Sequence, residues 1–126
     1  EEGIALIIVS HPQCGFSRAA IRALESDPVL AQALPKRRHY VAPTFGGLRL
    51  DTIRAWNTAH PSSRHVLVDR PLAWTFVQNW NTPQFLFLVD GKLVEHVEGW
   101  PDDGQKVALM KAARRAREIR ATEAVP

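Results

Sequence analysis

Residues 82–100, TPQFLFLVDGKLVEHVEGW, decide the fold because they predict a complete β-hairpin. The wholly apolar run FLFLV is typical of a buried strand, and the following LVEHVEGW alternates apolar with polar residues. Asp90-Gly91 between them is a strong signal for a tight hairpin turn. Thr82-Pro83 stands directly before the first strand, where a proline is tolerated and an X-Pro bond is sometimes cis.

Outside this hairpin, hydrophobic periodicity predicts strands that alternate with helices. This alternation, closed by a hairpin and a last helix, indicates an α/β fold with a central mixed sheet and helices on both faces. The expected strands are 4–10, 38–42 and 64–69, and the expected helices are one directly after Cys14-Gly15, then 28–34, 50–59, 71–80 and a last one from Asp102 to about residue 120.

Two of these helices and one turn depend on short local signals. The helix over 71–80 is predicted because apolar residues recur every four positions at Leu72, Phe76 and Trp80. Asp102 and Gln105 have the spacing of a capping box, which predicts that the last helix begins there. Gly46-Gly47 predicts a turn after the second strand.

Length and composition are those of one globular domain, which we expect to span residues 1–126. Apolar residues make up 45% and charged residues 23%, which excludes a disordered chain. No apolar run approaches the ~20 residues of a membrane-spanning helix, so we expect no span. Residues 106–120 hold six lysines and arginines against one glutamate. Because no aromatic residues are interleaved there, we interpret this segment as a solvated helix face and expect no nucleic-acid partner.

Cys14 is the only cysteine, so the chain can form neither an internal disulfide nor a multi-cysteine zinc site. It lies between the first predicted strand and the first turn of an amphipathic helix, where free N–H groups and the helix dipole lower the pKa of a thiol. The thiolate is the attacking species in disulfide exchange. Ser17, one turn later, can hydrogen-bond a thiolate but cannot replace a second thiol. The alternative is an inert cysteine that packs as a small hydrophobe.

The histidines and tryptophans near these segments give weaker signals. His11 stands three residues before Cys14 and is expected either to lower the pKa of the thiol or, with Cys14 and His96, to bind a metal. Isolated histidines are more often solvated or packing residues, so we expect no metal site. The four tryptophans are expected mainly in the core, with one at the rim of an active-site cleft.

Together, the cysteine segment SHPQCGFSR at 10–18, the Thr-Pro pair, the hairpin and the amphipathic last helix resemble the thioredoxin-like superfamily. The resemblance covers nearly the whole chain. It implies a cis bond between Thr82 and Pro83, next to Cys14, with the neighbouring backbone paired to an extended substrate. The site residues that it implies are the catalytic Cys14 and Ser17 and the substrate-binding Thr82, Pro83, His11 and Phe16.

The branch of the superfamily is indicated by two features that disagree. The Cys-Gly-Phe-Ser motif is similar to that of monothiol glutaredoxins, which hold an iron–sulfur cluster with glutathione. However, Cys14 and Pro83 are 69 residues apart, and the intervening 46–69 reads as an additional helix and strand. That insertion is similar to periplasmic, cytochrome-maturation-type thioredoxins and to peroxiredoxins. The lysine that glutaredoxins place before the motif is absent from 3–13.

We therefore expect a thiol–disulfide exchange protein, an oxidoreductase or isomerase, that acts through mixed disulfides of Cys14. The expected partner is a protein carrying a thiol or a disulfide, with glutathione as an alternative thiol and no resident cofactor. The periplasm is the expected compartment and the cytoplasm is the alternative; the sequence does not indicate an oligomeric state. Two other functions remain open, an iron–sulfur cluster carrier of the monothiol glutaredoxin type and a non-catalytic module that binds proteins in the same cleft.

Overall fold

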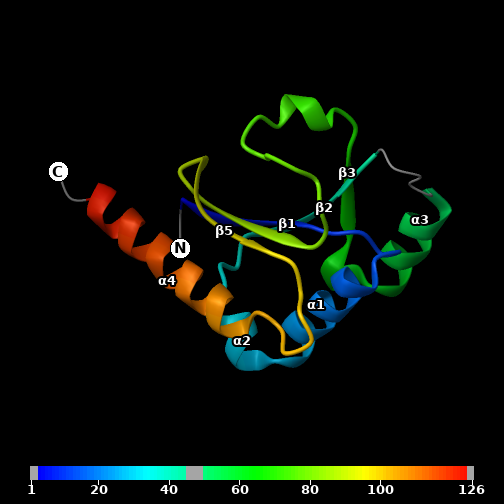
Figure 1. Ribbon diagram of the computed structural model, residues 1–126, viewed down its shortest axis with the longest axis horizontal. Helices are drawn as coiled ribbons and strands as arrows, with labels where there is room; N and C mark the ends of the chain where they lie inside the picture. Colours follow the sequence, from blue (N-terminus) through cyan, green and yellow to red (C-terminus); the bar gives the residue numbers. More distant parts are fainter. Residues whose placement is uncertain (1–2, 45–49, 125–126) are drawn as a thin grey trace.

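The computed structural model describes residues 3–44 and 50–124, which form a five-stranded sheet with helices (Figure 1). The strand order is β3-β2-β1-β4-β5. β1 pairs parallel with β2 and antiparallel with β4, so the sheet is mixed, as predicted. β2 pairs parallel with β3, and β4 pairs antiparallel with β5. The strands are β1 (Ile4–Val9), β2 (Arg38–Pro43), β3 (His65–Val68), β4 (Gln84–Val89) and β5 (Lys92–Glu98).

The strands lie within one or two residues of their predicted positions, and so do the described parts of α1, α2 and α3. Asp27 explains one boundary: its Oδ1 accepts the N–H groups of Val29 and Leu30, and Pro28 occupies the first helical position. The α-helices are α1 (Gly15–Ser26), α2 (Pro28–Ala33), α3 (Leu50–Ala59) and α4 (Lys106–Ala124), and the 3₁₀ turns are η1 (Pro61–Ser63) and η2 (Pro71–Ala73).

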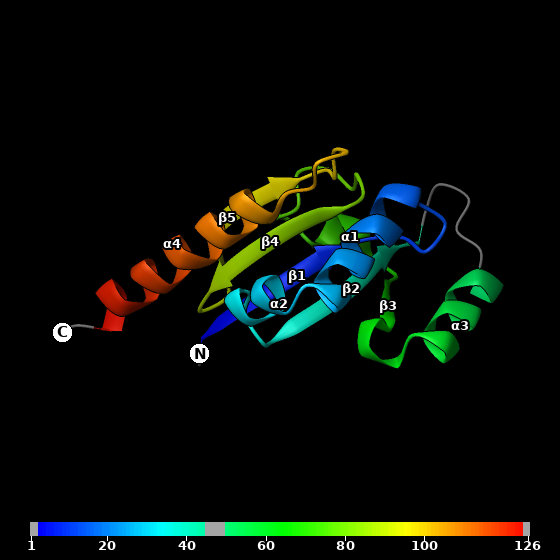
Figure 2. The same ribbon diagram turned by 90° about the horizontal axis from the view of Figure 1, so that it is seen from below.

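One face of the sheet is covered by α1, α2 and α4, as Figure 2 shows from that side. Its core is built from the inward residues of β1 and β4, against the apolar faces of these helices. α3 lies beside α1 toward the β3 edge, and its Trp56 packs against the same core. α4 packs on this core through a stripe of alanines and one leucine. The fully or almost fully buried members of that stripe are Leu109, Ala112, Ala113 and Ala116.

The opposite face is covered by the segment between β3 and β4, which lies above the sheet in Figure 1. The predicted helix over 71–80 is wrong: only the 3₁₀ turn η2 forms there. Leu72, which should begin a buried stripe, is 92% exposed. Trp74 instead contacts Phe76 and Trp80, with ring centroids 5.6 and 5.9 Å apart. These rings pack against the sheet from an irregular backbone, so this face has a 3₁₀ turn where an α-helix was expected.

The last helix begins later than the capping box predicts and continues further. Gln105 does not return to Asp102, because its amide Nε2 donates to the carbonyl of Glu98 at 3.1 Å. The helix therefore begins at Lys106 and ends at Ala124. The predicted Gly46-Gly47 turn lies outside the described residues. No helix in the described ranges is both long and apolar enough to cross a membrane.

Candidate active site around Cys14

Cys14 is held at the start of α1 by hydrogen bonds on both sides of it. Ser10 follows β1, and its N–H donates to the Val41 carbonyl at 2.9 Å, which continues the pairing with β2. The N–H of Cys14 donates to the His11 carbonyl at 2.9 Å, and its carbonyl accepts the N–H of Arg18 at 3.0 Å, in the first helical turn. The thiol is half-buried at the N-cap of α1.

The loop before β4 lies against the Cys14 sulfur. The peptide bond between Thr82 and Pro83 is cis. The Thr82 carbonyl lies 3.6 Å from Cys14 Sγ and accepts a hydrogen bond when the thiol is protonated. The Pro83 carbonyl accepts the N–H of Gly99 at 2.8 Å, which ties this loop to the end of β5. The structure thus brings two segments 68 residues apart into contact, as the resemblance to the thioredoxin-like superfamily implies.

Hydrogen bonds favour the thiolate of Cys14. Burial alone raises the pKa of the thiol, but hydrogen bonds from the side chains of Thr82 and Ser17 and from the N–H groups of Ser17 and Phe16 outweigh it, so the pKa lies below its ordinary value. Ser17 is fully buried, and its Oγ accepts the N–H of His11 at 3.2 Å. That bond leaves the Ser17 hydroxyl proton free to donate to sulfur.

His11 contributes its backbone to the site more directly than its ring. Its Nδ1 accepts the N–H of Gln13 at 3.1 Å, which places the proton of the neutral ring on Nε2. Burial lowers the pKa of His11, so the ring is neutral near pH 7. The predicted effect of His11 on the thiol is therefore indirect: its N–H orients Ser17, and Ser17 stabilises the thiolate.

Phe16 lies beside Cys14 on a shallow groove of about 330 Å³. Its ring is 61% exposed, although it is large and apolar. Trp100, at the end of the hairpin, also lines this groove. Asp102 is the only charged residue among the described ones that line the groove. The groove is therefore mainly apolar and carries a single negative charge.

Gln84 is a site residue that the sequence analysis missed. Its buried side chain donates through Nε2 to the carbonyls of Asn79 at 2.8 Å and Asn81 at 2.9 Å, so it fixes the loop that carries Thr82. Its Oε1 lies 3.0 Å from His96 Nε2 on β5. A glutamine at the start of an otherwise apolar strand was the available signal, because a buried amide needs partners.

His65 forms a second buried polar contact behind the site. Its Nε2 lies 2.7 Å from Ser10 Oγ, and Asn57 holds its backbone through bonds of 2.7 and 3.0 Å. Burial lowers the pKa of His65 to about 4, so the ring is neutral above that pH. Ser10 directly precedes His11, and this contact therefore supports the end of β1 from which the Cys14 loop departs.

The metal alternative finds no support in the geometry of the described residues. Within 3–44 and 50–124, no group of three or more His, Cys, Asp or Glu side chains is arranged to hold an ion. His96 bonds to Gln84 and lies 3.6 Å from Glu98.

No family model and no curated protein matches this sequence. Solved structures do match. A candidate thioredoxin from Neisseria meningitidis superposes with a TM-score of 0.61 at 13% identity, over 99% of this chain and 83% of that one. A secreted Mycobacterium tuberculosis disulfide oxidoreductase homologous to E. coli DsbE has a TM-score of 0.56 at 17% identity, with coverages of 90% and 81%. A candidate protein disulfide isomerase from Bacteroides thetaiotaomicron has a TM-score of 0.58 at 12% identity, with coverages of 94% and 74%. The chain therefore has a thioredoxin-like fold, in which Cys14 lies at the start of α1.

Proposed function

We propose that this protein exchanges thiols and disulfides through Cys14, its single nucleophile. The observation that carries the proposal is the position of the sulfur: at the N-terminus of α1, 3.6 Å from the carbonyl that precedes the cis proline. The lowered pKa of Cys14 supplies the thiolate, and the half-buried thiol leaves room for an attacking or leaving sulfur.

In the proposed reaction, the Cys14 thiolate attacks one sulfur of a substrate disulfide. A mixed disulfide forms, and the other substrate sulfur leaves as a thiolate. A different thiolate of the same substrate then attacks the substrate sulfur of the mixed disulfide and returns Cys14 as a thiolate. The substrate departs with a rearranged disulfide and no net change in oxidation state. If an external thiol makes the second attack, the substrate is left disulfide-bonded to that thiol.

Ser17 and Thr82 have distinct roles in this scheme. Ser17 donates a hydrogen bond from its hydroxyl to the thiolate, both before attack and when Cys14 is the leaving group. Ser17 has no sulfur, so it cannot resolve the mixed disulfide and release depends on a thiol of the substrate or a partner. The backbone of Thr82 is proposed to pair with an extended substrate segment, as a strand added beside the site.

A protein substrate suits the groove better than glutathione does. The walls formed by Phe16 and Trp100 fit an apolar side chain near the substrate cysteine. Asp102 is unfavourable for the two carboxylates of glutathione, and no lysine or arginine is among the described lining residues. The periplasm is the proposed compartment: one structural neighbour is a secreted protein, and disulfides persist in such oxidising spaces.

The proposal is tested with a disulfide-bonded peptide that carries leucine beside its cysteine. Mass spectrometry should detect a mixed disulfide at Cys14, and Cys14→Ser should abolish it. The protein should also rearrange the disulfides of a scrambled substrate protein, with the same dependence on Cys14. If no adduct forms while Cys14→Ala still binds the peptide normally, the protein is instead a non-catalytic binding module.

The Cys-Gly-Phe-Ser motif favours a second candidate, a carrier of an iron–sulfur cluster held with glutathione. Cys14 is the residue that would supply the cluster ligand. Anaerobic reconstitution with iron, sulfide and glutathione distinguishes the two candidates. Visible absorbance that depends on both Cys14 and glutathione would favour the carrier, and its absence would favour the exchange protein.

A further inference from the structure

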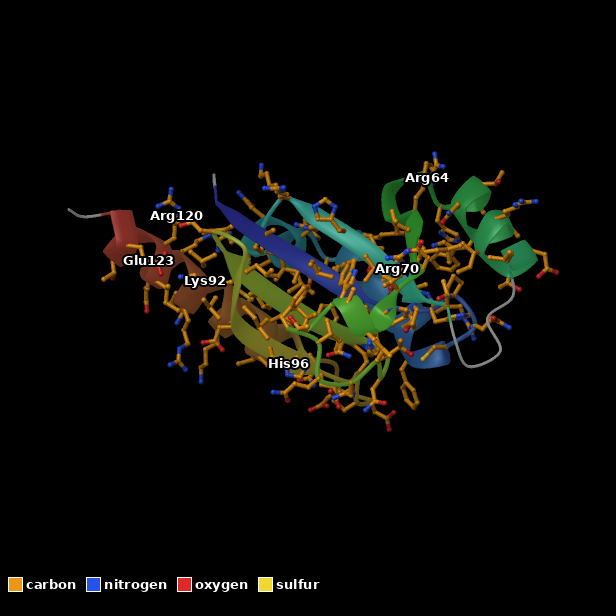
Figure 3. The ribbon with its side chains drawn as sticks, turned by 90° about the horizontal axis from the view of Figure 1, so that it is seen from above. Arg64, Arg70, Lys92, His96, Arg120 and Glu123 are labelled. Atoms are coloured by element: carbon orange, nitrogen blue, oxygen red, sulfur yellow. The ribbon has the colours of Figure 1, made fainter. Side chains whose placement is uncertain are left out.

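A second cavity lies away from Cys14, between α2, the start of β2 and the segment from η1 into β3. Its volume is about 760 Å³, within the range of small-molecule sites. None of the residues assigned to the Cys14 site lines it. Figure 3 labels Arg64, one of its lining residues, at the start of β3.

The charge of this cavity is one-sided. Lys36, Arg38 and Arg64 line it, and no aspartate or glutamate is among its described lining residues. None of these three cations forms an ion pair with any residue in the described ranges. Three unpaired cations around one hollow favour an anionic ligand, because each like charge raises the local positive potential.

Arg38 is fixed in position. Its Nε donates to the Pro35 carbonyl at 2.7 Å, and its Nη2 donates to the carbonyls of Ala31 and Leu34. Its Nη1 has no partner among the described residues, which leaves two N–H groups of a held guanidinium unused. A guanidinium that is already ordered loses little side-chain entropy when it binds an anion.

Tyr40 adds a donor to the cavity wall. The residue is only 7% exposed, yet it lines the cavity and its hydroxyl has no hydrogen-bond partner in the described part of the chain. Among the described residues, the buried side-chain atoms that lack a hydrogen-bond partner are Ser63 Oγ and His65 Nδ1. The Tyr40 hydroxyl also lacks a partner but is not one of these atoms, so it is accessible to solvent. It therefore faces the cavity. Burial raises the pKa of Tyr40, although Arg38 opposes this, so the phenol stays protonated and able to donate.

We propose that this cavity binds a small organic phosphate. A phosphate monoester accepts from the Arg38 fork, the Tyr40 hydroxyl and the two exposed cations Lys36 and Arg64, and it carries enough charge to match them. The remaining walls include Pro28, Ala31, Pro61 and Val66, which suit an apolar organic group. This site is separate from the thiol chemistry and does not depend on it.

The proposal is tested by titrating the whole ¹⁵N-labelled protein with phenyl phosphate and following its amide resonances. We expect saturable shifts confined to residues 36–40 and 61–66. Benzoate, which has the same ring and a smaller charge, should bind at least tenfold more weakly. Lys36→Gln combined with Arg64→Gln should weaken phenyl phosphate binding at least tenfold, and Tyr40→Phe should weaken it about tenfold through the loss of one hydrogen bond to a charged group.

Lys92→Gln is the matched control, because it removes an exposed cation far from Arg64 in Figure 3. It should leave the affinity unchanged. The Lys92→Gln variant and the Lys36→Gln, Arg64→Gln double variant should both keep the dispersion of the amide spectrum. Retained dispersion would show that weaker binding does not result from unfolding. Shifts that do not saturate, that map to other residues, that persist fully in the double variant, or that benzoate reproduces at equal affinity would each overturn the proposal.

Discussion

The stabilisation of the Cys14 thiolate by Ser17 gives the sharpest prediction. Ser17→Ala removes the hydroxyl proton that faces sulfur, and it also leaves the N–H of His11 without its acceptor. A hydrogen bond to a charged group contributes about 1.5–3 kcal/mol where water is excluded. Cys14 is only half-buried, so solvent compensates part of that loss. Since about 1.4 kcal/mol corresponds to one pKa unit, we expect the pKa of Cys14 to rise by about one unit at most.

The assay is the rate of iodoacetamide alkylation of Cys14 as a function of pH, with the midpoint read as the pKa. The native protein should show a midpoint below the ~8.5 of a free cysteine, and Ser17→Ala should move it upward. Ser63→Ala is the matched control, because it removes another fully buried serine hydroxyl, one that has no hydrogen-bond partner in the described part of the chain. An unchanged midpoint in Ser17→Ala, or an equal rise in Ser63→Ala, would refute the assigned role of Ser17. A native midpoint at or above the free value would refute the reactive thiolate itself.

Three further predictions follow from the same contacts. Gln84→Leu should release the loop that holds Thr82 and raise the pKa of Cys14, measured by the same alkylation profile; an unchanged profile would mean that Gln84 is not needed to position Thr82. Ser17→Cys should create a dithiol that closes on itself, so that the protein reduces disulfides without an external resolving thiol; insulin reduction measures this, and an internal disulfide that fails to form by mass spectrometry would count against it. The pKa of His65 falls from 6.5 to about 4 on folding, so the unfolded chain binds the proton more readily and stability should fall as pH drops from 6.5 toward 4. That loss should be about 3 kcal/mol by urea unfolding, and a His65→Gln variant with the same pH dependence would contradict the assignment.

The hairpin and the position of the cysteine were predictable because their signals are local. Asp90 and Gly91 have φ values of 50° and 80°, as a two-residue hairpin turn requires, and these two residue types adopt them readily. Cys14 and Ser17 are one helical turn apart, so a helix beginning at the cysteine was enough to predict their proximity.

The parts that were not predictable depend on contacts between distant segments. The segment 71–80 has a helical spacing of apolar residues, but its rings reach the sheet from an irregular backbone, and periodicity does not distinguish these cases. Gln84 bonds to a loop whose path is set by tertiary structure. His65 meets Ser10 across 55 residues, and no pattern in either segment indicates that pairing. The role of His11 was inferred from its ring, whereas its backbone N–H makes the contact.

The presence of one cysteine in a hydrogen-bonded, half-buried position also determines how the protein responds to peroxide. A reactive thiolate is oxidised first to a sulfenic acid, which is normally removed by condensation with a neighbouring thiol. Ser17 occupies the position from which such a thiol would act, and the chain has no other cysteine. A thiol that condenses with a sulfenic acid at Cys14 must therefore come from a second molecule, whose concentration sets how fast this acid is removed before it is oxidised to the irreversible sulfinic and sulfonic acids.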